Sequence, residues 1–153
     1  MGQLHMIKPL SQESYWLLNL RVNPESTRIQ VCMRKIERLM ERIRRGDVLS
    51  VLQVYTWYQS TIRINRYFEK EINWLTRRLH KKTKVKIENT PSRSCEYKLE
   101  VNNRISMSLF RALQQFDALM CVLEKCHVTS VFKSTKVYMA TCSKHKTMML
   151  DMV

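Results

Sequence analysis

Residues 27–46 have the sequence TRIQVCMRKIERLMERIRRG, and this stretch decides the expected fold. In its first part, Thr27–Met33, apolar side chains alternate with more polar ones, as in a strand with one buried face. From Arg34 the period becomes helical, because apolar residues recur at Ile36, Leu39, Met40 and Ile43. Gly46 then supplies a left-handed C-terminal stop. The pattern predicts a half-polar strand that leads into a short basic helix, which is the layout of a β-ribbon that reads DNA.

The polar side chains of this stretch suggest how DNA would be bound. Arg28 and Gln30 on the exposed face of the strand can hydrogen-bond base edges in a major groove, so we predict that they read the sequence. Four arginines of the helix share one stripe and are predicted to contact phosphates: Arg34, Arg38, Arg42 and Arg45. Like charges one turn apart destabilise a helix, which favours an external anion. Glu37 and Glu41 occupy a neighbouring row, so a solvated face with local ion pairs is the alternative.

The composition sets the class of partner. The 153 residues suffice for one domain with a proper core, and two glycines and three prolines indicate long helices. With 27 Lys+Arg against 13 Asp+Glu, the net charge is +14, which favours nucleic acid or an anionic membrane surface. No apolar run approaches the ~18 residues of a spanning helix, and no signal peptide is evident. We therefore expect a cytoplasmic protein with reduced thiols and no membrane association.

The order of patterns along the chain predicts the domain organisation. Residues 1–10 are expected to form a flexible arm, residues 11–130 a single helical domain with a β-ribbon, and residues 131–153 a partly helical or frayed extension. Ser11 is placed to cap a helix that runs to Leu20. Ser50 is placed to cap a second, long helix, with a break expected near Gln59–Thr61.

Basic residues continue through and beyond that long helix. Lys81, Lys82 and Lys84 lie in the run RRLHKKTKVK and are predicted to contact phosphates without specifying sequence. Four arginines lie among the aromatic residues of the same segment: Arg63, Arg66, Arg77 and Arg78. Such aromatics can stack on single-stranded bases, but at helical spacing they are more often core or dimer interface, which is the interpretation that we prefer.

A second strand, Glu96–Val101, is a rival for the DNA-reading ribbon. Its exposed face carries Lys98 between two acids, so electrostatics favours the first ribbon. A long helix follows, with Leu109, Leu113, Phe116, Met120 and Leu123 on one stripe, and is expected to be central to the core. Asp117 at the edge of that stripe is expected to pair with a basic group or a backbone amide.

The segment from Pro91 to His127 resembles a family of regulators encoded by conjugative plasmids and integrative conjugative elements, which includes the transcriptional activator AcaB. The resemblance rests on Pro91, Leu99-x-Val101-x-Asn103, Phe116-Asp117-x-Leu119 and His127-Val128, and more loosely on IQVCMRKIERL. The chain departs from the family at the turns, with Arg104-Ile105-Ser106 and Thr129 at the two ends of the helix. The resemblance implies a ribbon-helix-helix dimer that binds promoter DNA and regulates conjugative transfer genes.

Motifs for catalysis or cofactor binding do not stand out. Two isolated glycines form no phosphate loop, and the spacing of Cys121, Cys126, His127, Cys142 and His145 does not match paired zinc ligands, so buried thiols are expected. We expect a mainly α protein with short strands that uses no metal or cofactor and is not an enzyme. Its predicted function is that of a homodimeric, sequence-specific regulator that binds double-stranded DNA, with activation as the expected direction. A protein–protein accessory of the conjugation or secretion machinery and an RNA-binding protein remain the alternatives.

Overall fold

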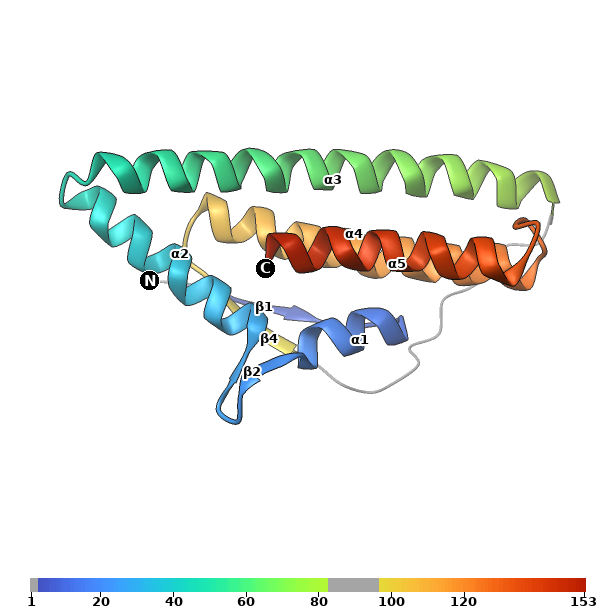
Figure 1. Cartoon of the computed structure of the whole chain (residues 1–153), viewed down its shortest axis with the longest axis horizontal. Coiled ribbons are helices and arrows are strands. Elements are labelled where there is room, and N and C mark those ends of the chain that lie inside the picture. The colour runs from blue at the N-terminus through green and yellow to red at the C-terminus, as the bar shows by residue number, and fades with distance from the viewer. Residues whose placement is uncertain (1–2, 83–96) are drawn as a thin grey trace.

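A long helix, α3 (Val48–Lys82), runs the length of the molecule and lies against α4 (Arg104–Val128) (Figure 1). The computed structural model describes residues 3–82 and 97–153. The other elements are β1 (Gln3–Ile7), α1 (Gln12–Asn19), β2 (Arg21–Asn23), β3 (Ser26–Thr27), α2 (Arg28–Arg44), β4 (Tyr97–Val101) and α5 (Thr135–Met152). The chain is thus mainly helical with short strands, which confirms the expected fold class at that level.

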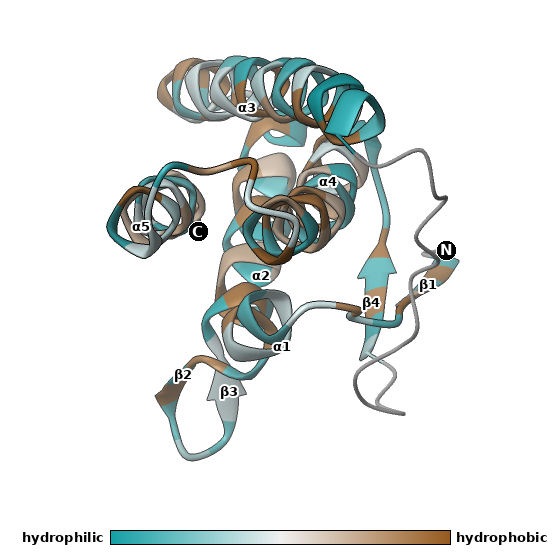
Figure 2. Ribbon diagram, turned by 90° about the vertical axis from the view of Figure 1, so that its right-hand side faces the viewer, coloured by the Kyte–Doolittle hydropathy of each residue, from teal (hydrophilic) through white to brown (hydrophobic). Residues whose placement is uncertain are grey.

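Helix α4 lies at the centre of the arrangement. Figure 2 shows α3 above it, α5 on one side and the pair β1–β4 on the other, with α1 below. The rings of Phe68 in α3 and Phe116 in α4 are fully buried, with centroids 6.2 Å apart. Leu109, Leu113 and Leu123 are at most 1% exposed. The prediction that this helix is central to the core is therefore confirmed.

Asp117 fixes α1 against α4 from within the core. Its carboxylate accepts hydrogen bonds from the backbone N–H of Ser11 (2.9 Å), the hydroxyl of Ser11 (2.8 Å) and the backbone N–H of Leu10 (3.1 Å). The Ser11 hydroxyl in turn accepts from the backbone N–H of Ser14 and so caps α1. The expected backbone-amide partner of Asp117 and the expected cap at Ser11 are both confirmed.

The strand predicted at Thr27–Met33 is wrong, because α2 begins at Arg28. Thr27 and Gln30 form a capping box: the Gln30 N–H donates to Thr27 Oγ1 (3.2 Å) and the Thr27 N–H donates to Gln30 Oε1 (3.0 Å). The buried residues Ile29, Cys32, Met33 and Ile36 then follow a helical period from the first turn. The apparent alternation over seven residues was the start of this apolar face.

The end of α2 is as predicted. Gly46 has a φ of 91°, and its N–H donates to Ile43 O while the N–H of Asp47 donates to Arg42 O. These two bonds make a Schellman motif, which needs a left-handed residue at the glycine position. Asp47, rather than Ser50, opens α3, because its Oδ1 accepts from the N–H groups of Leu49 and Ser50.

The expected break near Gln59–Thr61 is absent, since α3 continues from Val48 to Lys82. Thr61, which is fully buried, hydrogen-bonds Ser108 of α4 through the two hydroxyls (2.7 Å). Asn65 one turn later donates to Ser108 O (3.1 Å). The polar residues thus form an interhelical contact instead of interrupting the helix.

The two ends of the chain are more regular than expected. Residues 3–7, expected to belong to a flexible arm, form β1, which pairs antiparallel with β4 in the register His5 with Leu99. This pairing confirms a strand at Tyr97–Val101, whereas Glu96 lies outside the described residues. Near the C-terminus, Thr135–Met152 form α5, whose Cys142 and Met149 are buried.

Candidate nucleic-acid interface

Arg28 and Gln30, predicted to read bases from a strand, lie in the first turn of α2. The half-buried Arg28 donates from Nη2 to Leu150 O (3.0 Å) and so connects α2 with the end of α5. Gln30 is held by the capping box with Thr27. Both side chains therefore have intramolecular partners, and no ribbon presents them.

Gln30 and Lys98, which the sequence offered as base-reading residues of the two rival ribbons, line the same groove. This groove has a volume of about 460 Å³ and lies among α2, β4 and the β2–β3 hairpin. Its charged lining comprises Arg34 and Lys98 together with Glu25, Glu37 and Glu100. Three carboxylates against two cations make this groove unfavourable for the phosphates of DNA.

The predicted arginine stripe of α2 is solvent-exposed: Arg34, Arg38, Arg42 and Arg45. Carboxylates of α2 share the face, because Glu41 makes ion pairs with Arg44 (3.3 Å) and Arg45 (3.5 Å). Arg34 donates from Nη2 to the Ser26 hydroxyl (2.5 Å). The alternative of a solvated face with local Glu–Arg pairs thus describes the end of α2 that carries Arg44 and Arg45.

A second row of cationic side chains lies on α3, and it differs from the α2 row in its ion pairs. Its members are Arg63, Arg66, Lys70, Arg77 and Lys81, which we call the α3 stripe. At about 100° per residue these positions fall within one narrow sector, and residues 63 to 81 span about five turns and about 27 Å. All five side chains are exposed, and none forms an ion pair with a carboxylate in residues 3–82 and 97–153.

Two acids of this part of α3 flank the stripe without forming an ion pair with it. Glu69 lines a groove between α3 and α4 together with Arg66. Glu71 lines a cavity between α3 and α5, and also a hollow that it shares with Lys70 and Arg77. Trp74 fills the gap in the stripe between Lys70 and Arg77 and is 49% exposed. The five exposed cations of the α3 stripe therefore outnumber the two acids beside them. Helix α3, which carries them, forms the upper edge of the molecule in Figure 1.

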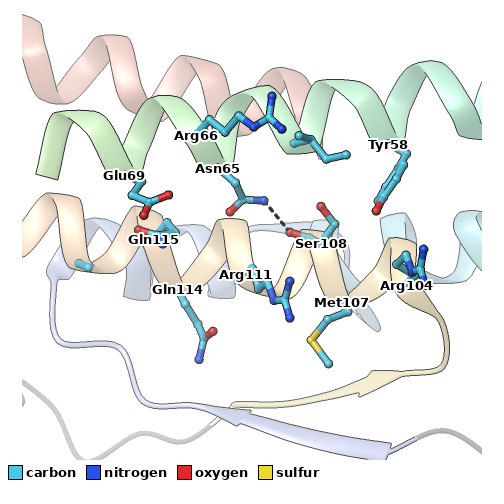
Figure 3. Close-up of a pocket in the computed structure, with 12 residues that line it drawn as sticks. Tyr58, Asn65, Arg66, Glu69, Arg104, Met107, Ser108, Arg111, Gln114 and Gln115 are labelled. Atoms are coloured by element: carbon cyan, nitrogen blue, oxygen red, sulfur yellow. Dashed lines mark hydrogen bonds between the residues drawn. The ribbon is translucent and has the colours of Figure 1, made fainter. Parts of the chain in front are cut away.

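Two arginines of α4 extend this positive surface. Arg104 and Arg111 line, with Arg66, a groove of about 680 Å³ between the two helices. Figure 3 shows Arg66 reaching from α3, and Arg104 and Arg111 from α4, with the Asn65–Ser108 hydrogen bond between Arg66 and Arg111 in this view. Three arginines against Glu69 give the lining a positive balance, in contrast to the groove beside β4.

The predicted phosphate contacts of the basic run lie at the end of α3. Lys81 belongs to the α3 stripe, whereas the Lys82 ammonium donates to Ser130 O (2.7 Å). Lys84 lies outside the described residues. Lys70, Arg104 and Arg111 were missed by the sequence analysis. The spacing of Lys70 from Arg63, Arg66, Arg77 and Lys81 along a helix was a signal that could have found it.

The described residues also bear on metal sites, free thiols and membrane-spanning helices. Within them, no group of three or more His, Cys, Asp or Glu residues is arranged to hold a metal ion. Cys121, Cys126 and Cys142 are buried free thiols, as expected, and burial raises the pKa of Cys121 to about 12. No helix in the described ranges has the length and apolar character needed to cross a bilayer.

Comparison with known proteins yields a likeness of fold. No protein-family model matches the chain. No curated protein sequence matches it either. Among solved structures, the crystal structure of selenomethionine-containing AcaB from uropathogenic E. coli matches with a TM-score of 0.75 and 14% sequence identity. The match covers 99% of this chain and 75% of AcaB. The chain is thus similar to AcaB in fold.

Proposed function

We propose that this chain is a DNA-binding regulator and that the α3 stripe, extended by Arg104 and Arg111, contacts the phosphates of a duplex. The observation that supports this most strongly is the exposed line of five cations without carboxylate partners among the described residues. Duplex DNA carries one negative charge per ~1.7 Å of axis, so about 16 charges lie along the ~27 Å of the stripe. Binding would release counterions from both surfaces.

The regulatory part of the proposal rests on resemblance. The motifs around Leu99–Asn103 and Phe116–Leu119 resemble the family that includes AcaB, and the likeness in fold to AcaB agrees with this. We therefore propose a non-enzymatic, sequence-specific regulator of conjugative transfer genes, with activation as the expected direction, acting in the cytoplasm. A ribbon-helix-helix form would use β4, α4 and α5, which follow in that order, but β4 pairs with β1 of the same chain.

We further propose a homodimer that forms through the beginning of α3. Val48, Leu49, Leu52 and Tyr55 are 71%, 72%, 60% and 61% exposed, which is unusual for a cluster of apolar side chains. A second copy would cover this surface and place two α3 stripes in one particle. L49E/L52E should shift the molar mass by light scattering from dimer to monomer, whereas M139E, at an exposed methionine of α5, should not. A monomeric wild type would contradict the dimer but not DNA binding.

The DNA proposal is tested by two triple variants that remove the same charge. K70Q/R77Q/K81Q neutralises part of the α3 stripe, and R38Q/R42Q/R45Q neutralises part of the α2 face. We expect the first to weaken duplex binding by roughly two orders of magnitude at 100 mM salt. The second should weaken it by less than about fivefold, through net charge alone. Fluorescence anisotropy with a labelled duplex measures both, and circular dichroism checks that each variant is folded.

Sequence specificity needs a separate experiment. Footprinting on promoters of conjugative transfer genes should show protected sites at protein concentrations that leave unrelated DNA unprotected. If the protein bound all duplexes equally, the proposed phosphate-contacting surface would stand. The proposal of a sequence-specific regulator would be contradicted. No protection, together with stable co-purification of a transfer protein, would favour the accessory-factor alternative. Preference for single-stranded RNA over duplex would favour the RNA-binding alternative.

A further inference from the structure

The outer side of α3 changes character along its length. Residues 48–62 carry no charged side chain, in a chain of which 26% of the residues are charged. From Arg63 onward the same side of the helix is the α3 stripe. At about 100° per residue, the exposed side chains of Val48, Leu52 and Tyr55 fall in the sector that the stripe continues. The outer side is thus one line along the helix, uncharged at its beginning and cationic farther on.

The uncharged part of this line has the spacing of a surface that pairs with another helix. Five of its residues, which we call the α3 seam, follow at intervals of four, three, four and three: Val48, Leu52, Tyr55, Gln59 and Ile62. A period of 3.5 residues keeps side chains against a second helix. The opposite side of α3 packs on the core through its buried residues Ser50, Val54, Thr61, Phe68 and Leu75. The seam therefore faces away from the protein's own helices.

A second copy of α3 fits this seam in the antiparallel direction. Each copy carries a formal charge of +14, so two copies approach closely only where neither presents charge, as in residues 48–62. Parallel pairing would place the two α3 stripes side by side at about 8–10 Å between helix axes, within the Debye length of about 10 Å at 0.1 M salt. Antiparallel pairing joins only the uncharged parts. A two-fold axis then packs Leu52 of each copy on Tyr55 of the other.

Antiparallel pairing also fixes where the two stripes lie. Because seam and stripe share one sector of α3, the stripe of each copy points to the side of the interface on which the other copy lies. It stays uncovered, because the other α3 begins at Val48, opposite Gln59, and Arg63 follows one turn later. Figure 1 shows α2 leaving the beginning of α3 on the side of the body, away from the outer side. At 1.5 Å per residue, each stripe extends from about 14 Å to about 41 Å from the two-fold axis, in opposite directions.

We propose that the dimer bridges two separate DNA segments, one on each α3 stripe. This inference rests on the proposed homodimer and the proposed DNA-binding surface, and it adds their relative placement. Because the stripes face opposite sides at opposite ends of the paired helices, one straight duplex does not contact both at once. Each stripe of about 27 Å covers roughly eight base pairs, at about 3.4 Å per base pair. The two segments are separate duplexes or two sites of one looped DNA molecule.

The test is a capture experiment with the full-length protein. A duplex of about 20 base pairs, longer than one stripe, is fixed on beads, and a fluorescent copy of it is added with the protein. Fluorescence on the beads reports bridging. L52E/Y55E brings four acids together in the seam and should lower capture at least about tenfold. Its affinity for the fixed duplex should change by less than about threefold, through net charge alone.

Two further variants serve as controls for capture. V137E/M139E adds the same charge at two exposed apolar side chains of α5 and should capture the second duplex like wild type. K70Q/R77Q/K81Q should lose capture together with binding of the fixed duplex. Loss of capture without loss of binding is therefore specific to the seam.

The direction of pairing is tested by cross-linking with a short bismaleimide. In the antiparallel dimer Val48 of one copy lies beside Gln59 of the other, so a mixture of V48C and Q59C should cross-link, whereas V48C alone should not. In a parallel dimer V48C would cross-link with itself. Wild type gives the background from the protein's own cysteines, of which four are buried: Cys32, Cys121, Cys126 and Cys142.

Three results overturn the proposal while leaving DNA binding intact. They are binding of the fixed duplex without capture of the second, capture by L52E/Y55E at the wild-type level, and cross-linking of V48C alone as strong as that of the mixture. A protein that binds no duplex at all overturns the bridging together with the proposed DNA-binding function.

Discussion

Helices α2 and α3 both carry rows of basic residues, yet they differ in whether the neighbouring acids form ion pairs with them. On α2, Glu41 lies next to the arginine row and pairs with Arg44 and Arg45. On α3, Glu69 and Glu71 flank the α3 stripe, but neither forms an ion pair with it, so the stripe has no described carboxylate partner. A surface that neutralises its own charge gains little from an external anion, whereas an uncompensated surface gains most.

The comparison shows that the number of basic residues does not locate an anion-binding surface. The α2 row is as dense as the α3 stripe, but its neighbouring groove beside β4 has more carboxylates than cations. The α3 stripe instead adjoins a groove with Arg66, Arg104 and Arg111. The ion pairs of each row and the balance of charges in the adjoining groove therefore decide which face we assign to DNA.

Charge reversal should separate the two helices most strongly. K70E/R77E/K81E is expected to weaken duplex binding by roughly three orders of magnitude, because three attractive phosphate contacts become repulsive. R38E/R42E/R45E makes the same change in net charge on α2 and should lose less than about tenfold. Equal losses in anisotropy titrations would mean that net charge, and not the α3 stripe, governs binding.

The buried carboxylate of Asp117 and the exposed carboxylate of Glu41 should differ in their effect on stability. Asp117→Ala leaves the buried donors of Leu10 and Ser11 without their acceptor and should lower the free energy of unfolding by about 3 kcal/mol. Glu41→Ala removes two exposed ion pairs and should change it by less than about 0.5 kcal/mol. Urea denaturation measures both. A large loss for Glu41→Ala would contradict the view of α2 as a weakly paired, solvated face.

Trp74, in the gap of the α3 stripe, distinguishes duplex from single-stranded partners. Trp74→Ala should change duplex affinity by less than about threefold, because phosphate contacts do not use the ring. If the partner were single-stranded, loss of a stacked base would cost about 1–3 kcal/mol. Titrations with a duplex and with one of its strands, using Trp74→Phe as the control, decide between them.

The smallest effect is expected in the groove beside β4. Gln30→Ala and Lys98→Gln should leave the ratio of cognate to unrelated DNA affinity within about twofold, because neither side chain belongs to the α3 stripe. Competition binding with the two DNAs measures this ratio. A loss of preference with an unchanged far-UV spectrum would restore a base-reading role to this groove.

The sequence predicted much of the fold. Ser11, Gly46 and the apolar stripe from Leu109 to Leu123 were identified because caps and helical periods are local patterns. The start of α2 was missed although Thr27 and Gln30 carry the T-x-x-Q pattern of a capping box. Seven alternating residues also fit a strand, and only the helical burial of Ile29, Cys32 and Met33 resolves the choice.

The candidate site was less predictable. Lys81 was identified from the basic run, but the stripe depends on α3 being continuous across Thr61, where a break was expected. Arg104 and Arg111 join Arg66 only because α4 packs against α3, and such pairing between distant segments leaves no local pattern in the sequence.

The salt dependence of duplex binding tests the central claim most directly. A plot of log affinity against log salt concentration should have a slope that is smaller in magnitude by about 2.7 for K70Q/R77Q/K81Q than for wild type, at about 0.9 per lost phosphate contact. For R38Q/R42Q/R45Q the slope should match that of the wild type. Equal flattening by the two triple variants, or no flattening by the first, would contradict the assignment of the DNA-binding surface to the α3 stripe.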